Sequence, residues 1–199
     1  MATTTKSKSG LNGLGAGNGF GGWGNGGGGP AGRAMPPDTY RLGMMFGLAG
    51  ISMLFISLTS AYVVRQGLGA DWQRTRMPDL LWANTALLVA SSFTFEAARR
   101  SLSRRWLTVT LVLGLAFLGG QLAVWSQLAA SGIYLGTNPH SSFFYTLTGL
   151  HGLHVLGGLA ALGYLTARVR RRWVEVTALY WHFMDGLWLY LMVLLFWRG

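Results

Sequence analysis

The sequence contains no cysteine and few charged residues for its length of 199. The absence of cysteine excludes disulfide bonds and thiolate metal sites. Charged residues make up 11% of the chain, against about 25% in typical soluble domains, and hydrophobic residues make up 51%. No Asp, Glu, Lys or Arg occurs between Arg105 and Arg168, a stretch too long to form the exterior of a water-soluble protein. The composition therefore indicates a protein surrounded by lipid.

Residues 1–37 differ in composition from the rest of the chain. Gly, Ser, Thr and Asn dominate this segment, and few of its side chains could form a core. We expect a disordered, Gly-rich tail. A cleaved secretory signal would need a continuous apolar segment, whereas Leu11, Leu14 and Phe20 are separated by glycines, so we expect the tail to stay on the cytoplasmic side.

Residues 38–199 contain five apolar segments, each near the roughly 20 residues that a helix needs to span hydrocarbon. They predict an all-α, polytopic membrane helix bundle with transmembrane helices at about residues 42–64, 80–98, 106–130, 142–167 and 173–197. Residues 131–132 and 136–139 supply the turn between the third and fourth helices. In the first helix, Gly43, Gly47 and Gly50 recur at helical spacing, which predicts the close approach of another helix.

The basic residues predict the orientation of the bundle. The net charge of +10 would suit nucleic acid, but the charges lie in short groups between long apolar segments. If the chain crosses five times, twelve Lys and Arg fall on one side of the membrane and four on the other, these four being Arg65, Arg74, Arg76 and Arg198. Because cytoplasmic connections carry the excess of basic residues, we expect a cytoplasmic N-terminus and a C-terminus outside.

Polar residues cluster in the last two predicted helices. His151 and His154 are spaced i, i+3, and so are His182 and Asp185, which places each pair on one helix face. The short Arg-rich connection between these helices favours their being neighbours, so that the pairs could meet. A carboxylate near the bilayer centre costs about 2.5 to 3.5 kcal/mol, so Asp185 is expected to face protein.

Three interpretations of this cluster remain open on the residues alone. Imidazoles and a carboxylate suit zinc, iron or copper, although no third histidine pair completes a di-iron pattern. Intramembrane His and Asp also mark proton relays. The third interpretation is hydrogen bonding between helices, which is also the role expected for five further polar side chains: Asn84, Thr85, Thr110, Gln121 and Gln127.

Two long motifs resemble a known family. Residues 148–155 read Thr-Gly-x-His-Gly-x-His-Val, and Glu175 is followed by Tyr-Trp-His-Phe-x-Asp-x-x-Trp at residues 180–188. Both are similar, in this order, to the last two helices of subunit III of the haem-copper terminal oxidases, such as cytochrome c oxidase. The resemblance covers about residues 40–199 and begins at the third helix of the seven-helix members, as in the short five-helix bacterial form.

The resemblance implies an accessory subunit of a proton-translocating oxidase in the bacterial cytoplasmic (inner) membrane. Haem and copper then belong to partner subunits I and II, cytochrome c is the expected electron donor, and a larger respiratory supercomplex is a further possible partner. This chain is expected to bind phospholipid, to stabilise the catalytic subunit, and to hold neither a metal nor a catalytic residue. The residues carried over as structural or lipid-adjacent are His151, His154, Glu175, His182 and Asp185.

One departure and several alternatives accompany the resemblance. Many members carry a buried Glu in the helix that matches the first one here, whereas residues 50–55 contain no acid. The same motifs occur in subunit III of quinol oxidases and in homologues associated with nitric-oxide reductase. A stand-alone metalloenzyme using His151, His154 and His182 would be a different class, and a small transporter would show broken helices or an internal repeat.

Overall fold

The computed structural model describes residues 37–68, 72 and 78–198, and every regular element in this part of the chain is an α-helix. The five helices are α1 (Pro37–Leu68), α2 (Leu80–Ser101), α3 (Arg104–Ala130), α4 (Pro139–Ala167) and α5 (Arg171–Arg198). The prediction of an all-α chain is thus confirmed. The expected tail lies outside the described residues except for Pro37, which begins α1.

The short connections between helices follow from a few residues. α4 begins three residues earlier than predicted, because Pro139 is its first residue and Asn138 caps it. The Asn138 side chain accepts a hydrogen bond from Ser141 N at 2.8 Å, and Ser141 Oγ accepts one from Asn138 N at 3.2 Å. Gly132, with φ of 75°, turns the chain after α3. The Pro139 that the sequence suggested as part of the turn therefore starts the helix.

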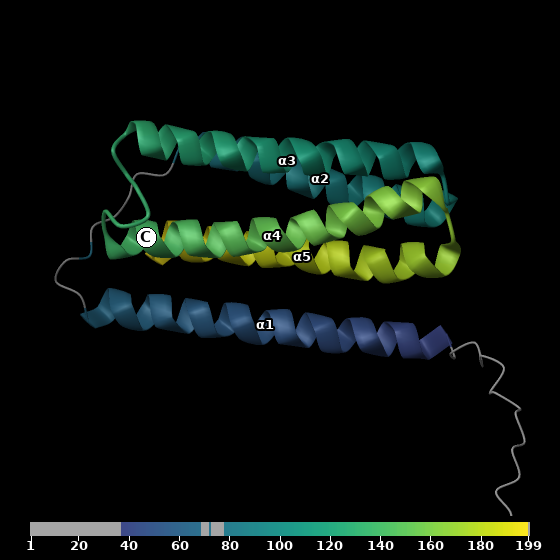
Figure 1. Ribbon diagram of the computed structural model, residues 1–199, viewed down its shortest axis with the longest axis horizontal. Coiled ribbons are helices and arrows are strands. Elements are labelled where there is room, and N and C mark those ends of the chain that lie inside the picture. The colour runs from purple at the N-terminus through teal and green to yellow at the C-terminus, as the bar shows by residue number, and fades with distance from the viewer. Residues whose placement is uncertain (1–36, 69–71, 73–77, 199) are drawn as a thin grey trace, which may run out of the picture. The chain divides into compact units, whose positions relative to one another are not determined.

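The helices lie side by side, with α2 and α3 packed as a hairpin against α4 and α5 (Figure 1). α1 contacts α4 and α5 and has no comparable contact with α2 or α3. The core between the other four helices contains large side chains that are fully buried, among them Phe95, Phe117, Trp181 and Trp188. α1 is therefore a peripheral helix, and Phe46 on its outer face is 70% exposed.

Glycines permit the close packing of the inner helices. A Cβ added to Gly114 of α3 would lie 2.7 Å from Leu159 Cδ2 and 2.9 Å from Trp181 Cη2. A Cβ at Gly120 would collide with the side chain of Asn84. By contrast, the predicted glycine stripe of α1 faces open space, with nothing within 4 Å of an added Cβ at Gly43, Gly47 or Gly50. Close approach between the described helices thus uses Gly114 and Gly120 of α3, and also Gly158 of α4, where an added Cβ would lie 3.0 Å from Tyr180 Cε1. It does not use these glycines of α1.

Four of the described helices, α1, α3, α4 and α5, are long and apolar enough to cross a membrane. α2 is shorter, at 22 residues, and carries Glu96, Arg99 and Arg100 near its end. Its buried face is also partly polar, with Asn84 1% exposed and Ser91 fully buried. α2 therefore owes its place in the bundle to polar contacts as well as to apolar packing.

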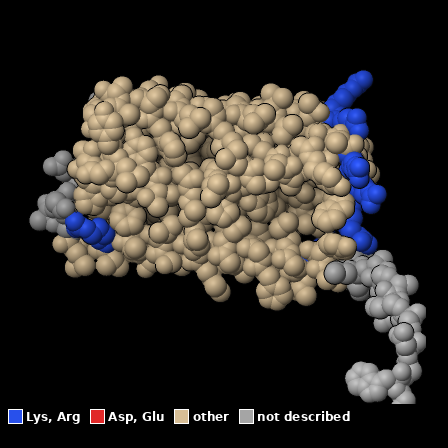
Figure 2. Space-filling view, in the orientation of Figure 1, with Lys and Arg blue, Asp and Glu red and all other residues tan. Residues whose placement is uncertain are grey.

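Basic side chains gather at one end of the helical unit (Figure 2). This end, here called the arginine-rich end, carries nine arginines: Arg41, Arg99, Arg100, Arg104, Arg105, Arg168, Arg170, Arg171 and Arg172. Arg65 lies at the other end, in the last turn of α1. Five further basic residues of the predicted count, Lys6, Lys8, Arg33, Arg74 and Arg76, lie outside the described residues.

Candidate functional site

His151 lies in the centre of the bundle. It is fully buried, with its ring centroid 5.0 Å from that of Trp188 in α5 and 5.9 Å from that of Phe117 in α3. Neither ring nitrogen has a hydrogen-bond partner among the described residues. His151 therefore acts in this structure as an aromatic packing residue that joins three helices.

His154, one turn further along α4, faces a different neighbour. Its Nδ1 lies 2.7 Å from the carbonyl oxygen of Leu150, and its ring stands edge-on to Phe55 of α1, with centroids 5.8 Å apart. Tyr180 Oη of α5 donates a hydrogen bond of 2.7 Å to the carbonyl oxygen of His154. The neighbourhood of His154 thus connects α4 to both α1 and α5.

His182 and Asp185 of α5 face α2. His182 Nδ1 lies 2.6 Å from Ser92 Oγ, and its Nε2 lies 3.8 Å from Glu96 Oε2. Asp185 is 6% exposed. Neither of its carboxyl oxygens has a hydrogen-bond partner within the described chain. The two histidine-bearing pairs therefore point to different helices.

Glu175 lies near the arginine-rich end, where its Oε1 accepts a hydrogen bond of 3.3 Å from Arg171 Nε. It also lines a groove of about 530 Å³ between α1, α2 and α5. The charged or titratable lining residues are Arg41, Glu96, Arg99, Glu175 and His182. Apolar side chains complete the wall, including those of Met45, Leu48, Val176 and Leu179. The groove, here called the α1–α2–α5 groove, therefore combines charged groups with an apolar wall.

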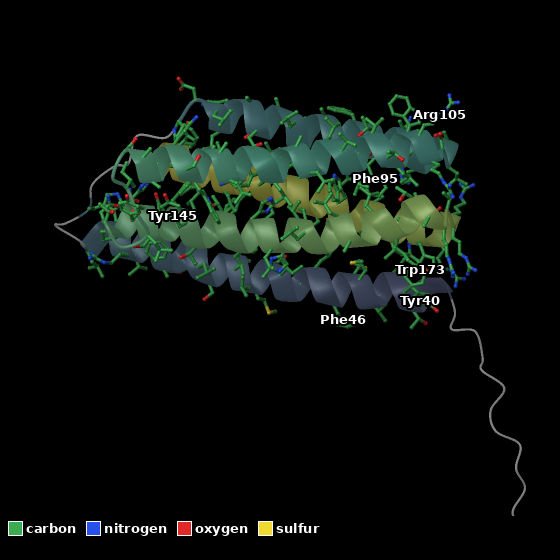
Figure 3. All side chains as sticks on the ribbon, turned by 45° about the horizontal axis from the view of Figure 1, so that its top comes forward. Tyr40, Phe46, Phe95, Arg105, Tyr145 and Trp173 are labelled. Atoms are coloured by element: carbon green, nitrogen blue, oxygen red, sulfur yellow. The ribbon has the colours of Figure 1, made fainter. Side chains whose placement is uncertain are left out.

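Further contacts between side chains lie beside the groove. Glu96 accepts hydrogen bonds from Arg99 Nε and Arg100 Nε, both at 2.7 Å. Tyr40 of α1 and Trp173 of α5 lie side by side at the arginine-rich end, with ring centroids 5.3 Å apart (Figure 3). The Arg172 guanidinium lies 5.3 Å from the centroid of the Tyr40 ring. These contacts attach the start of α1 to α5 beside the groove.

Hydrogen bonds between helices also involve the two tryptophans of the second motif. Trp181 Nε1 donates to Ser91 Oγ and Trp188 Nε1 to Thr85 Oγ1, each at 3.0 Å, so both tryptophans tie α5 to α2. The spacing of Trp181 and Trp188 by seven residues places both on one helix face and predicts that they pack, but it does not predict these hydrogen bonds. Ser92, the partner of His182, has no comparable signal in the sequence.

The polar side chains predicted to join helices do so in four of five cases. Asn84 Nδ2 donates to Gln121 Oε1 at 3.3 Å, and Thr110 Oγ1 lies 2.8 Å from Thr94 Oγ1. Thr85 accepts the bond from Trp188. For Gln127 the prediction is not confirmed, because its side chain is exposed on α3 and makes no hydrogen bond to another helix within the described residues.

The arrangement of the motif histidines and acids also bears on metal binding. Within the part of the chain that the structure describes, no three His, Asp or Glu side chains come together in a group that could hold a metal ion. The reason is geometric: His151 packs between Phe117 and Trp188, whereas His182 is directed to Ser92 and Glu96. The motif histidines are thus distributed over separate helix contacts.

Comparison with known proteins identifies the family. The family described as "Cytochrome c oxidase subunit III" matches residues 35–199, which is the whole helical unit. The chain belongs to the cytochrome c oxidase subunit III family. The match includes both motif helices, α4 and α5, and the groove-lining residues of α1 and α2.

Curated relatives of the chain come from several bacteria. The chain is 33% identical to a probable cytochrome c oxidase subunit 3 of Mycobacterium leprae over 178 residues, which is 80% of this chain and 88% of the relative. It is 31% identical to cytochrome c oxidase subunit 3 of Thermostichus vulcanus, with the same shares covered. It is 30% identical to cytochrome c oxidase subunit 3 of a Synechocystis species, covering 80% of this chain and 76% of that one.

Proposed function

We propose that the chain is the accessory subunit III of a proton-translocating haem-copper terminal oxidase in aerobic respiration. In this proposal haem and copper lie in partner subunits I and II, cytochrome c is the electron donor, and this chain contributes no redox centre and no catalytic residue. The observation that carries the proposal is the family match over residues 35–199. It is supported by the use of His151, His154 and His182 in contacts between helices.

In the same proposal all five helices cross the bacterial cytoplasmic membrane. α2 falls short of the apolar composition of the other four, but it packs along α3, and its polar side chains are directed to α3 and α5, away from lipid. The arginine-rich end then lies in the cytoplasm, which puts the N-terminus inside and the C-terminus outside. A cysteine-accessibility assay on the naturally cysteine-free chain, with a cysteine at Arg170 or at Trp197, would report the two sides directly.

The five motif residues have structural and lipid-adjacent roles in this account. His151 and His154 pack α4 against α1, α3 and α5, and Asp185 and His182 face α2. Glu175 and His182 line the α1–α2–α5 groove. A rigid bundle of this kind is suited to support a catalytic partner, because interfaces on packed helices keep their geometry on binding.

The α1–α2–α5 groove is proposed to hold a phospholipid. Arg41 and Arg99 lie at the arginine-rich end, where phosphate groups of the bilayer are found, and guanidinium groups bind phosphate well. Arg41 has no ion-pair partner among the described acids, whereas Arg99 is paired with Glu96. The apolar wall below, which includes Met45 and Leu48, is suited to an acyl chain.

Arg41→Gln is expected to weaken retention of phosphatidylglycerol. One basic residue near the membrane surface contributes about 1 kcal/mol to the binding of an anionic lipid, which corresponds to about a fivefold loss. Native mass spectrometry of the purified full chain, with phosphatidylglycerol or phosphatidylcholine added, measures the bound fraction. Arg170→Gln is the matched control, because Arg170 is exposed at the same end but lies outside the groove. Equal retention by the two variants would refute the groove as the lipid site.

The proposed function as a whole is tested by purification through a tag on this chain. Mild solubilisation of membranes from the native bacterium is expected to yield a complex in which mass spectrometry finds oxidase subunits I and II in equal amounts with this chain. The recovery of quinol-oxidase or nitric-oxide-reductase subunits would replace the cytochrome c oxidase assignment. Recovery of the chain alone under conditions that preserve other respiratory complexes would contradict an accessory role.

A further inference from the structure

A line of polar side chains leads from the α1–α2–α5 groove into the interior of the bundle. In the groove, Glu96 Oε2 lies 3.8 Å from His182 Nε2. On the opposite edge of the imidazole, Nδ1 lies 2.6 Å from Ser92 Oγ. Asp185 follows His182 by three residues, so its side chain lies one turn further along the same face of α5. The four side chains alternate between α2 and α5, so the line follows the interface of these two helices.

Asp185, at the inner end of this line, has no charged partner among the residues that the structure describes. It is 6% exposed, and neither carboxyl oxygen accepts a hydrogen bond from the described residues. The nearest cations along the line, Arg99 and Arg100, are bound to Glu96, each at 2.7 Å. On the α4 side, His151 packs against Trp188. The basic residues of α1 are Arg41, which lines the groove, and Arg65, which lies in the last turn at the other end of the helix. A bare carboxylate in these surroundings is costly, and a proton removes the charge.

The outer part of the line is open to the groove. The His182 side chain is 39% exposed and that of Glu96 is 26% exposed, and both line the groove. Water or a lipid headgroup at the arginine-rich end can therefore reach His182. Imidazole can take up a proton on one nitrogen and release one from the other, so it can transfer a proton between the groove and Ser92 without moving.

We propose that Asp185 is a protonatable site inside the membrane, which exchanges its proton with the groove through Ser92 and His182. For uptake, a proton from the groove binds Nε2 of His182, the Nδ1 proton passes to Oγ of Ser92, and the hydroxyl proton of Ser92 passes to the Asp185 carboxylate. One proton leaves the groove, the carboxyl group gains one, and no electron moves. Release follows the reverse order. Proton exchange at Asp185 goes beyond holding helices together. It rests on the proposed function only in that the proposed orientation places the groove on the cytoplasmic side of the membrane.

The test is infrared spectroscopy of the purified full chain in dodecyl maltoside, a detergent without carbonyl groups. The chain has six acidic side chains, so a protonated carboxyl band can be assigned to Asp185 by its loss in Asp185→Asn. On transfer to D₂O the band is expected to move to lower wavenumber quickly. Ser92→Ala is expected to slow this exchange by about tenfold or more, because the hydroxyl that passes the proton is missing.

Two control variants separate proton transfer from a general change in the bundle. Ser92→Thr keeps a hydroxyl at the same position and is expected to restore rapid exchange. Ser126→Ala removes a hydroxyl that bonds only within α3, to the Ala123 carbonyl oxygen, and is expected to leave the exchange unchanged. A carboxyl band that persists in Asp185→Asn, or equal exchange rates in wild type and Ser92→Ala, would overturn the proposal. Either result would leave the purification test of the accessory role unaffected.

Discussion

Gly114→Leu is expected to prevent stable packing of the helix bundle. A Cβ at this position would lie 2.7 Å from Leu159 Cδ2 and 2.9 Å from Trp181 Cη2, and a leucine adds three further carbons. Trp181 cannot move aside, because it is 1% exposed and its Nε1 is bonded to Ser91. Overpacking at such a site costs about 3 kcal/mol. Thermal melting followed by fluorescence size-exclusion chromatography should show a large fall in the melting temperature.

Gly119→Leu on the same helix is the matched control for this prediction. Nothing lies within 4 Å of a Cβ added there. The free energy of unfolding of this variant should therefore lie within about 0.5 kcal/mol of the wild-type value. Similar melting of the Gly114 and Gly119 variants would mean that α3 does not approach α4 and α5 as closely as the structure describes.

Trp188→Ala should have the second large effect. Trp188 is fully buried, its ring centroid lies 5.0 Å from those of Phe117 and His151, and its Nε1 bonds to Thr85 of α2. Removing a buried tryptophan leaves a cavity and costs about 3 to 5 kcal/mol. The same melting assay measures the loss.

Two comparisons separate the contributions of Trp188. Trp188→Phe keeps a ring but loses the hydrogen bond to Thr85, whose hydroxyl still donates to the Leu81 carbonyl oxygen. It should therefore cost less than Trp188→Ala, with about 1 kcal/mol from the lost bond. Trp197→Ala removes a side chain that is 79% exposed and should leave the melting temperature unchanged. If Trp197→Ala proved as harmful as Trp188→Ala, the assignment of Trp188 to the packed core would be wrong.

The helices were predictable from the sequence because the apolar segments are long and are separated by charged or turn residues. The described helices extend a few residues beyond the predicted limits, since hydropathy marks the hydrocarbon-spanning part and the helical hydrogen bonds continue past it. Pro139 was taken as part of a turn, although its missing N–H group is compatible with the first helical position. The short turns between helices were thus the least predictable part of the fold.

The arrangement of the candidate site was predictable only in part. The spacing of His151 and His154 places both on one side of α4, yet one ring contacts Trp188 and the other Phe55, because three different helices surround this side. The α1–α2–α5 groove combines residues of α5 with residues of α1 and α2, which lie far from α5 in the chain. No local sequence pattern therefore predicts it. Ser92 of α2, which contacts His182 of α5, likewise becomes significant only in the packed structure.

The glycine stripe of α1 illustrates the same limit. Gly43, Gly47 and Gly50 have the spacing that favours a helix pair, but they face open space in this chain. Gly114, by contrast, belongs to no such repeat, yet α4 and α5 pack directly against it. The spacing of small residues predicts where a helix can approach, whereas the complete set of neighbours decides where it does.

The most direct test of the accessory role is the optical spectrum and metal content of two preparations, the complex purified through a tag on this chain and the chain expressed alone. The account predicts haem absorbance and copper in the complex, and neither in the isolated chain. Copper or haem bound stoichiometrically to the isolated chain would contradict it, and so would a complex with neither.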